Sequence, residues 1–412
     1  MISVVDILIE AGQILLGPAG NHLTDAAVLV RGGSIEAVGL RAEIAQHAAA
    51  DTQVLRAPEA TVLPGLINSH VHLAFDAGPD PVGALQDTDD TDLLLGMASR
   101  ARQLLDAGIT TARDLGDRNE LAVRLREAIA QGRLPGPRLL TATTPLTPPG
   151  GHCWFLGGEV DPDNPHALRE RVRRNATAGA DVIKVMVSGG QLTPGGAAMG
   201  ESQFTTNQLR IIVDEARQAG LPVAAHAHGT QAIASAVDAN VDTIEHCTWM
   251  TPNGRFAPDE DIARRIATHG IAVCAASSQW RRILERLGED RAAPLLGRLR
   301  WMADLGIRLI TGTDAGLPGS EFTDIVNALE LYEYLGFTHD QTIELATVNS
   351  ARALGLGTRT GQLTPGYDAD LLVVDGDPRH DLHALRRIRL VLTQGRLHIP
   401  TGATYRKHHM PE

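Results

Sequence analysis

Residues 180–190 read ADVIKVMVSGG, a short apolar run that ends in a glycine-rich turn. This pattern predicts a buried strand, yet Lys184 lies in its middle. The chain has 37 lysines and arginines, and only Lys184 and Lys407 are lysines. Because lysine is rarely buried unless another group pairs with it, the sequence raises the question of what Lys184 does inside the protein.

Seven other runs predict buried strands, and helical patterns fall between them. They are TVLPGLINSHVHL (61–73), GITTARDLG (108–116), PRLLTAT (137–143), LPVAAHAHG (221–229), VDTIEHC (241–247), GIAVCAAS (270–277) and RLITGTDAG (308–316). Apolar residues at helical spacing, followed by glycine, predict helices at 93–108, 207–220 and 261–270. Eight strands that alternate with helices predict an α/β fold of the (β/α)8 barrel type at 59–357.

Both ends of the chain are rich in short strand patterns separated by glycine-containing turns. These patterns lie at 4–15, 26–39 and 52–57, and again at 361–377 and 388–399. We therefore predict that residues 1–58 and 358–412 together form one small β-domain, and that the barrel is inserted between them.

Composition and charge limit the partners and the cell compartment to be expected for this protein. The net charge of −12 argues against nucleic acid and anionic membranes as partners. The chain has no apolar run of about 18 residues, and its N-terminus has the features of a strand pair and lacks those of a signal peptide. Cys153, Cys247 and Cys274 form no CxxC pair, which favours packing roles in a reducing, cytoplasmic compartment. Alanine-rich helix faces would permit a homo-oligomer.

Several predicted strands carry potential metal ligands near their C-terminal ends. His70 and His72 are two residues apart, which places both side chains on one face of a strand. The other candidates are Lys184, His226, His228, His246 and Asp314. Nitrogen and oxygen donors without thiolate are typical of catalytic zinc, or of another first-row ion.

Each donor also has an ordinary explanation. A His-x-His pair can lie on the surface, Asp314 can cap a helix, and His246 can hydrogen-bond to the adjacent Glu245. These explanations do not account for donors at the same end of different strands, so a metal site is favoured.

Lys184 fits this site only if its amine is neutral. An unperturbed lysine has a pKa of about 10.4 and is cationic at neutral pH, but burial lowers that pKa. A neutral amine can add CO2 to form a carbamate, whose two oxygens could each bind one metal ion. Arginine cannot do this, because its guanidinium stays protonated. The alternative is an ordinary ion pair of Lys184 with a carboxylate such as Asp114.

Together these motifs resemble the amidohydrolase superfamily, most of all its imidazolonepropionase-like subgroup, which includes prolidase-like Xaa-dipeptidases. The resemblance rests on VLPGLINSHVHL (62–73), GITTARDLG (108–116), IKVMVSGG (183–190), AAHAHG (224–229), IEHC (244–247), TGTDAG (311–316) and GQLTPGYDADLLVVDGDP (361–378). It covers nearly the whole chain. One departure is Asn68, where many members have Asp and deaminase-like members have Asn.

The resemblance implies a distorted (β/α)8 barrel, a small β-sandwich formed by both chain ends, and two divalent metal ions, with Zn²⁺ as the expected ion. It implies that His70, His72 and Asp314 bind one ion, that His226 and His246 bind the other, and that carboxylated Lys184 bridges the two. It also implies that His152, in PPGGHCW, lies over the scissile carbonyl and that His228 contacts the substrate. The alternatives are an ordinary loop histidine for His152 and a histidine that only supports a ligand for His228.

The implied reaction is hydrolysis of a linear amide, in a dipeptide or an N-acyl amino acid. A hydroxide between the ions would attack, Asp314 would pass its proton to the leaving nitrogen, and His152 would stabilise the oxyanion. One alternative is a hydrolase of a cyclic amide, a carbamate or a urea, or a deaminase. Another is a non-catalytic scaffold. Lys184 argues against the deaminases, which generally use one metal, and the complete donor set argues against the scaffold.

The segment 74–92, AFDAGPDPVGALQDTDDTD, is rich in Asp. If it overhung the pocket it would favour a cationic substrate side chain. An ordinary solvated loop is the favoured interpretation.

Overall fold

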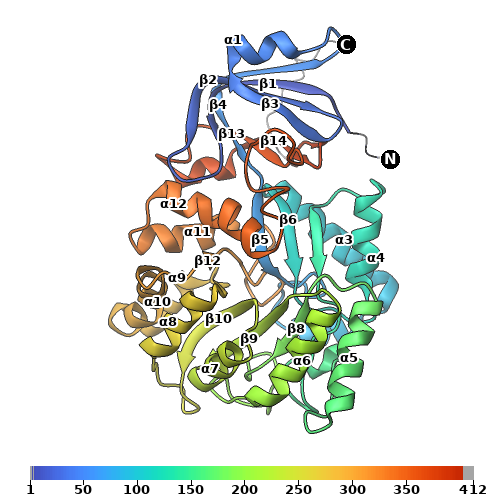
Figure 1. The fold of residues 1–412 in the computed structure, drawn as a ribbon, viewed down its shortest axis with the longest axis vertical. Helices are drawn as coiled ribbons and strands as arrows, with labels where there is room; N and C mark the ends of the chain where they lie inside the picture. Colours follow the sequence, from blue (N-terminus) through green and yellow to red (C-terminus); the bar gives the residue numbers. More distant parts are fainter. Residues whose placement is uncertain (1, 3, 402–412) are drawn as a thin grey trace.

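The computed structural model describes residues 2 and 4–401 and shows a mixed α/β fold with three hydrogen-bonded sheets. In Figure 1 the first strands and the last strands lie together at one end of the molecule, and the parallel strands with their helices form the larger part. The expected α/β class is confirmed.

The terminal sheet has seven strands in the order β15-β14-β13-β4-β1-β2-β3. Their bounds are β1 Ile7–Leu15, β2 His22–Arg31, β3 Ser34–Leu40, β4 Gln53–Pro64, β13 Leu371–Asp375, β14 Ile388–Thr393 and β15 Arg396–His398. Branched side chains such as Ile9, Val28, Val62 and Val373 are buried against one face, as the strand pattern requires. The expected domain boundaries and the two-layer sandwich stay predictions, and residues 402–412 lie outside the described part.

The expected strand at 61–73 is divided between two sheets. Strand β4 passes the expected boundary at residue 58 and ends at Pro64, and β5 begins at Leu66 in a different sheet. Proline has no backbone N–H with which to extend a ladder, so the change of sheet occurs there.

Eight parallel strands form the other two sheets, in the orders β5-β6-β7 and β12-β11-β10-β9-β8. Their bounds are β5 Leu66–Val71, β6 Ile109–Asp114, β7 Arg138–Thr141, β8 Ile183–Met186, β9 Val223–Gly229, β10 Thr243–Met250, β11 Ala272–Cys274 and β12 Leu309–Ile310. Single parallel bridges join the sheets at both seams, Leu146 with Val185 and Val71 with Ala315. Because pairing leaves two sheets and not one continuous ladder, the closed barrel stays a prediction.

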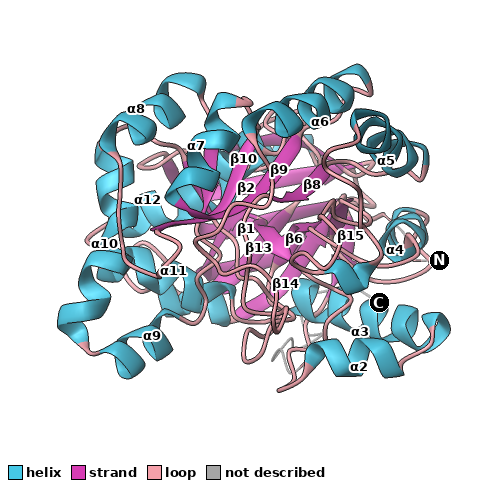
Figure 2. Cartoon of the chain, turned by 90° about the horizontal axis from the view of Figure 1, so that it is seen from below, coloured by secondary structure: helices cyan, strands magenta, loops and turns pink. Residues whose placement is uncertain are grey.

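Helices surround the parallel strands (Figure 2). They are α2 Pro81–Asp87, α3 Asp90–Asp106, α4 Leu121–Ala130, α5 Pro165–Thr177, α6 Thr206–Gln218, α7 Thr230–Asp238, α8 Glu260–His269, α9 Trp280–Leu287, α10 Glu289–Asp304, α11 Ile325–Tyr334, α12 His339–Glu344 and α13 Ser350–Ala353. The short helix α1, Arg41–Ile44, packs instead against β2 and β3 of the terminal sheet (Figure 1). The expected helices at 93–108, 207–220 and 261–270 correspond to α3, α6 and α8. None of the helices among the described residues has the length and apolar character of a bilayer span.

Helix α3 shows how the local sequence sets these elements. Asp89 caps its first turn by accepting hydrogen bonds from the backbone N–H groups of Thr91 and Asp92. Met97, Ala101 and Leu104 recur at helical spacing and are fully buried. The chain then turns at Gly108, whose φ of 81° is in the left-handed region that glycine adopts readily.

Candidate metal centre and active site

The donors expected from the sequence converge at the carboxyl ends of the parallel strands, the edge where parallel α/β folds place their sites. His70 is near the end of β5, Lys184 lies in β8, and Asp314 follows β12. His226 and His228 lie in β9, His246 in β10, and His152 in the loop after β7. With His72, and with His70 just behind it, these residues border one cavity of about 640 Å³.

His70, His72 and Asp314 form a first group of potential ligands. His70 Nε2 lies 3.2 Å from His72 Nε2 and 3.2 Å from Asp314 Oδ1, and His72 Nε2 lies 3.4 Å from the same oxygen. Burial by itself would raise the pKa of Asp314, but the charge of His70 and hydrogen bonds from both histidines hold that pKa well below its usual value. The group therefore presents an ionised carboxylate beside two imidazoles.

Glu245 fixes the orientation of His70. Glu245 Oε2 accepts from His70 Nδ1 at 2.9 Å, and Glu245 Oε1 accepts from Arg113 Nη2 at 2.7 Å. Burial would raise the pKa of Glu245, yet the charge of Arg113 and the bond from His70 keep it below its usual value. A proton held on Nδ1 would leave His70 Nε2 free to bind an ion in place of its contact with Asp314, the tautomer that an ion requires.

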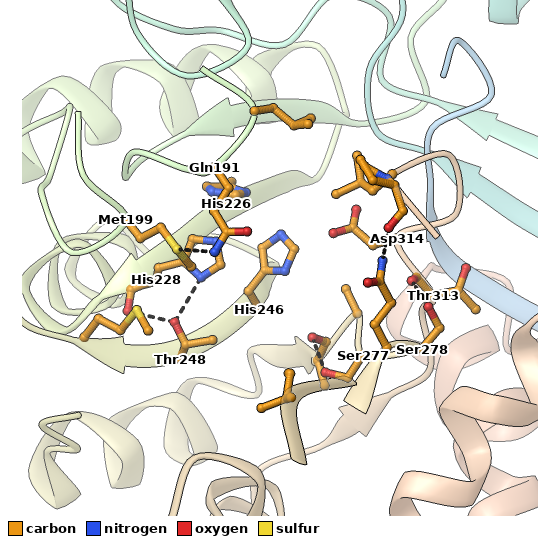
Figure 3. A pocket seen from close by; sticks show the side chains of 18 of the residues that line it. Gln191, Met199, His226, His228, His246, Thr248, Ser277, Ser278, Thr313 and Asp314 are labelled. Carbon is orange, nitrogen blue, oxygen red and sulfur yellow. Dashed lines mark hydrogen bonds between the residues drawn. The ribbon is translucent and has the colours of Figure 1, made fainter. Parts of the chain in front are cut away.

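His226, His228 and His246 form a second group, with ring nitrogens within 4.8 Å of one another. Burial lowers the pKa of all three, for His228 to about 3, so the imidazoles are neutral. Figure 3 shows His226 and His228 on one side of the cavity and Asp314 with Thr313 on the other.

The rings of this second group have two different relations. His226 and His246 meet edge to face, with centroids 4.7 Å apart and planes at 72°. His228 instead stacks on His246, with centroids 4.5 Å apart and planes at 20°. The in-plane lone pairs of stacked rings lie in nearly parallel planes and do not readily meet at one ion. The geometry of His226 and His246 is therefore better suited to a shared ion, and His228 borders the cavity beside them.

Two of these donors have backbone conformations that are uncommon for residues with side chains. His246 has φ of 69° and Asp314 has φ of 60°, both in the left-handed region. The conformation at 246–247 is held by Arg298 in α10, whose guanidinium donates to the carbonyl oxygens of His246 at 3.3 Å and Cys247 at 3.2 Å. Such outliers cluster at functional sites.

Lys184 is fully buried, and its Nζ has no hydrogen-bond partner among the described residues. Burial lowers the pKa of its ammonium. The alternative partner, Asp114, is engaged elsewhere: its carboxylate accepts from the N–H groups of Leu73 at 2.7 Å and Gly116 at 3.1 Å. An unpaired buried amine is costly, so the site supplies a lysine that requires a further partner.

His152 lies over the second group, with its ring centroid 4.7 Å from that of His226. Its Nδ1 is 3.2 Å from Thr193 Oγ1, and that oxygen accepts from the N–H of Cys153 at 2.9 Å. The Thr193 hydroxyl is then free to donate to Nδ1, which leaves Nε2–H as the donor of His152. Burial lowers the pKa of His152 to about 4, so the ring is neutral at pH 7.

Residues 61–398 match the sequence profile described as Amidohydrolase family. The chain belongs to the amidohydrolase family. Ochratoxinase from Aspergillus niger is 26% identical over 422 aligned residues, 93% of this chain and 84% of the relative. An imidazolonepropionase from Chloroflexus aggregans is 25% identical over 402 residues, 88% of each chain.

A crystal structure of a Xaa-Pro dipeptidase with bound methionine superposes with a TM-score of 0.83 and 26% identity, over 96% of this chain and 100% of the other. The expected likeness to imidazolonepropionase-like and prolidase-like amidohydrolases is confirmed. The family and these relatives support an enzyme that hydrolyses C–N bonds in small molecules.

The donor set of this amidohydrolase fits metal ions. Two groups of nitrogen and oxygen donors converge on the cavity, and the Lys184 amine, in β8, has no hydrogen-bond partner among residues 2 and 4–401. Neutral imidazoles and a carboxylate are suited to divalent first-row ions.

Sequence reasoning missed several residues of the site, and it raised one segment that the cavity does not include. The sequence assigned no role to Arg113 or Arg298 and considered Glu245 only as a partner of the adjacent His246, although a charged residue within a buried strand was a signal for Arg113 and Glu245. The cavity also has Arg282 and Arg286 on its wall. No residue of 74–92 borders the cavity, so the acidic segment gives no reason to expect a cationic substrate.

Proposed function

We propose that the protein hydrolyses a linear amide bond in a dipeptide or an N-acyl amino acid, with two divalent ions that we assign as zinc. The observation that carries the proposal is the buried Lys184 amine, which has no hydrogen-bond partner in the described part of the chain and lies beside two groups of potential metal ligands. Zinc is assigned because the donors are imidazole and carboxylate, without thiolate.

In this proposal His70, His72 and Asp314 would hold one ion, His226 and His246 would hold the other, and Lys184, as a carbamate, would supply an anionic ligand to both. The neutral amine forms an N–C bond to CO2 and loses a proton, which gives an anion with two oxygens. When bound, two such ions polarise a carbonyl and make water nucleophilic near neutral pH. Glu245 supports this arrangement by holding the tautomer of His70.

The remaining chemistry belongs to side chains. Asp314, kept ionised by His70 and His72, takes the proton of the attacking water and delivers it to the leaving nitrogen. His152 donates Nε2–H to the oxygen that becomes negative in the transition state. His228 meets the substrate from β9, with its Nδ1 2.9 Å from Thr248 Oγ1. The dipeptidase likeness supports the choice of a linear amide.

A hydrolase of a cyclic amide or a carbamate is the second candidate, because the chain is also similar to an imidazolonepropionase. One screen separates the two. Metal-loaded protein is offered dipeptides and N-acyl amino acids beside hydantoins and carbamates, and its metal content is measured. We expect two ions per chain and turnover in the first group. Turnover only in the second group would reject the linear amide, and fewer than one ion per chain would favour a non-catalytic scaffold.

A further inference from the structure

Three arginines, Arg282, Arg286 and Arg298, border the cavity, and we call them the arginine wall. None of them lies within 4.0 Å of a carboxylate oxygen among the described residues, whereas Arg113, Arg118 and Arg281 each pair with one. Asp314 is the one acidic side chain that borders the cavity. In a chain with a net charge of −12, this is a local excess of positive charge, and the described residues place no carboxylate within 4.0 Å of it.

Helix α9 directs two of these arginines to one face. The α9 residues that border the cavity are Arg282, Ile283, Arg286 and Leu287, a spacing that defines a single helical stripe. Arg281 belongs to another face, where it pairs with Glu330 at 2.5 Å and lies over the Trp280 ring. Two like charges four residues apart repel each other, so an anion between them would stabilise the stripe.

Part of the arginine wall lies against the loop that follows β12 and contains Asp314. A β-carbon built on Gly319 would lie 2.0 Å from Arg282 Nη1, so the guanidinium rests against the loop that follows Asp314. Gln279, which precedes α9, donates to the carbonyl oxygen of Pro318 at 2.8 Å. The Arg282 side chain and the start of α9 thus lie against the same loop that supplies Asp314.

Arg298 is the buried member of the wall, with 4% of its surface exposed. Its hydrogen bonds go to the carbonyl oxygens of His246, Cys247 and Leu295, which are neutral. A buried charge without a counter-charge is unfavourable. An anion in the cavity would provide that counter-charge.

We propose that the arginine wall binds a carboxylate at the end of the substrate remote from the scissile bond. The proposal rests on the proposed amide hydrolysis and names its substrate class: an acyl compound with a free carboxylate beyond the bond that is cleaved. A cavity of about 640 Å³ has room for such a molecule, since small-ligand sites span roughly 300–1,000 Å³. Two sources share this chemistry, the main-chain carboxylate of a dipeptide and the side chain of a terminal Asp or Glu.

The test uses Arg282→Gln, Arg286→Gln and the double variant in metal-loaded protein, with Arg291→Gln as control. Arg291 is an exposed arginine of α10 that does not border the cavity. Substrates are a dipeptide with a neutral C-terminal residue, its C-terminal amide, and the same dipeptide ending in Glu. For carboxylate substrates we expect KM to rise about fivefold for each single variant and further for the pair, without simple multiplication because the two arginines share one anion. We expect kcat to change less than twofold, and Arg→Lys variants to keep most of the affinity.

Comparison of the three substrates shows which carboxylate of the substrate the arginine wall binds. Loss confined to the Glu-ending dipeptide assigns the side-chain carboxylate, and loss with both free acids but not the amide assigns the main-chain group. Equal KM changes for the amide and the acids, or none for any substrate, would overturn the proposal.

A second measurement tests the arginine wall independently of the proposed amide hydrolysis. Calorimetric binding of glutarate to metal-loaded protein does not depend on turnover. Glutarate that binds the parent but not the double variant supports the wall even if no linear amide is cleaved. Absence of glutarate binding to the parent, or equal binding to both proteins, rejects the wall.

Discussion

At the scale of single residues, the account depends on the amine of Lys184. We expect Lys184→Arg to lower kcat/KM by at least about 100-fold, beyond the usual effect of losing a group that only supports a ligand. The reason is that a guanidinium stays protonated and cannot add CO2. Metal content per chain, measured by elemental analysis, should fall together with kcat/KM.

A chemical rescue experiment is a second test of the carbamate at Lys184. Lys184→Ala leaves a space into which a short carboxylate can enter. We expect acetate to restore part of the activity and of the metal content, and neutral acetamide to restore neither. Full activity of Lys184→Arg would contradict the carbamate.

Glu245 supports both a ligand and the fold. Glu245→Gln removes the charge that faces Arg113, and breaking a buried pair lowers the free energy of unfolding by about 3–5 kcal/mol. Loss of the partner of His70 should weaken metal binding about 10- to 100-fold. Urea unfolding and chelator competition measure the two effects. The control Glu36→Gln breaks an exposed pair with Arg31, with 37% and 39% of the side chains exposed, and should cost less than about 1 kcal/mol.

Asp114 gives stability a pH dependence. Burial raises its pKa to about 7 in the folded protein, whereas the unfolded value is about 3.9. Its contribution is therefore fully present below about pH 4 and is lost as pH rises to about 7. We expect the unfolding free energy of Asp114→Asn, minus that of the parent, to increase over this window. A difference that stays flat from pH 4 to 8 would show that Asp114 is ionised throughout.

At the scale of elements, the loop after β8 and the loop after β7 meet closely. A β-carbon on Gly190 would lie 2.3 Å from Cε1 and Nε2 of His152. Gly190→Ala should therefore displace the His152 ring and lower kcat/KM as much as His152→Ala does, without loss of metal. Gly297→Ala is the matched control, because no atom lies within 4 Å of its added carbon, and it should leave kcat/KM unchanged. Normal activity of Gly190→Ala would remove the proposed role of His152.

Helix α10 contributes to the site from outside the strands. Arg298 reaches from this helix to the carbonyl oxygens of His246 and Cys247, where the backbone has positive φ. The helix thereby restrains the end of β10 and the metal-ligand candidate that it carries. The strand alone does not account for this conformation.

At the scale of the whole molecule, the sequence predicted the α/β class and which donors lie together around the cavity, because each donor occupies a visible position near a strand end. It did not predict that Glu245 pairs with His70, since that contact joins β10 to β5 across 175 residues. It treated 61–73 as one strand because apolar pattern alone does not reveal a change of sheet at Pro64. The arginine wall could not be predicted either. Helical spacing predicts that residues share one face of a helix, but it does not predict that the face borders a cavity.

The central claim is that Lys184 carries a carbamate that joins two ions. The most direct measurement is the electron density at this side chain, in crystals of protein supplied with zinc and bicarbonate. We predict a planar, branched density beyond Nζ, with an ion at each terminal oxygen. An unbranched side chain that ends at Nζ, beside one ion or none, would contradict the claim.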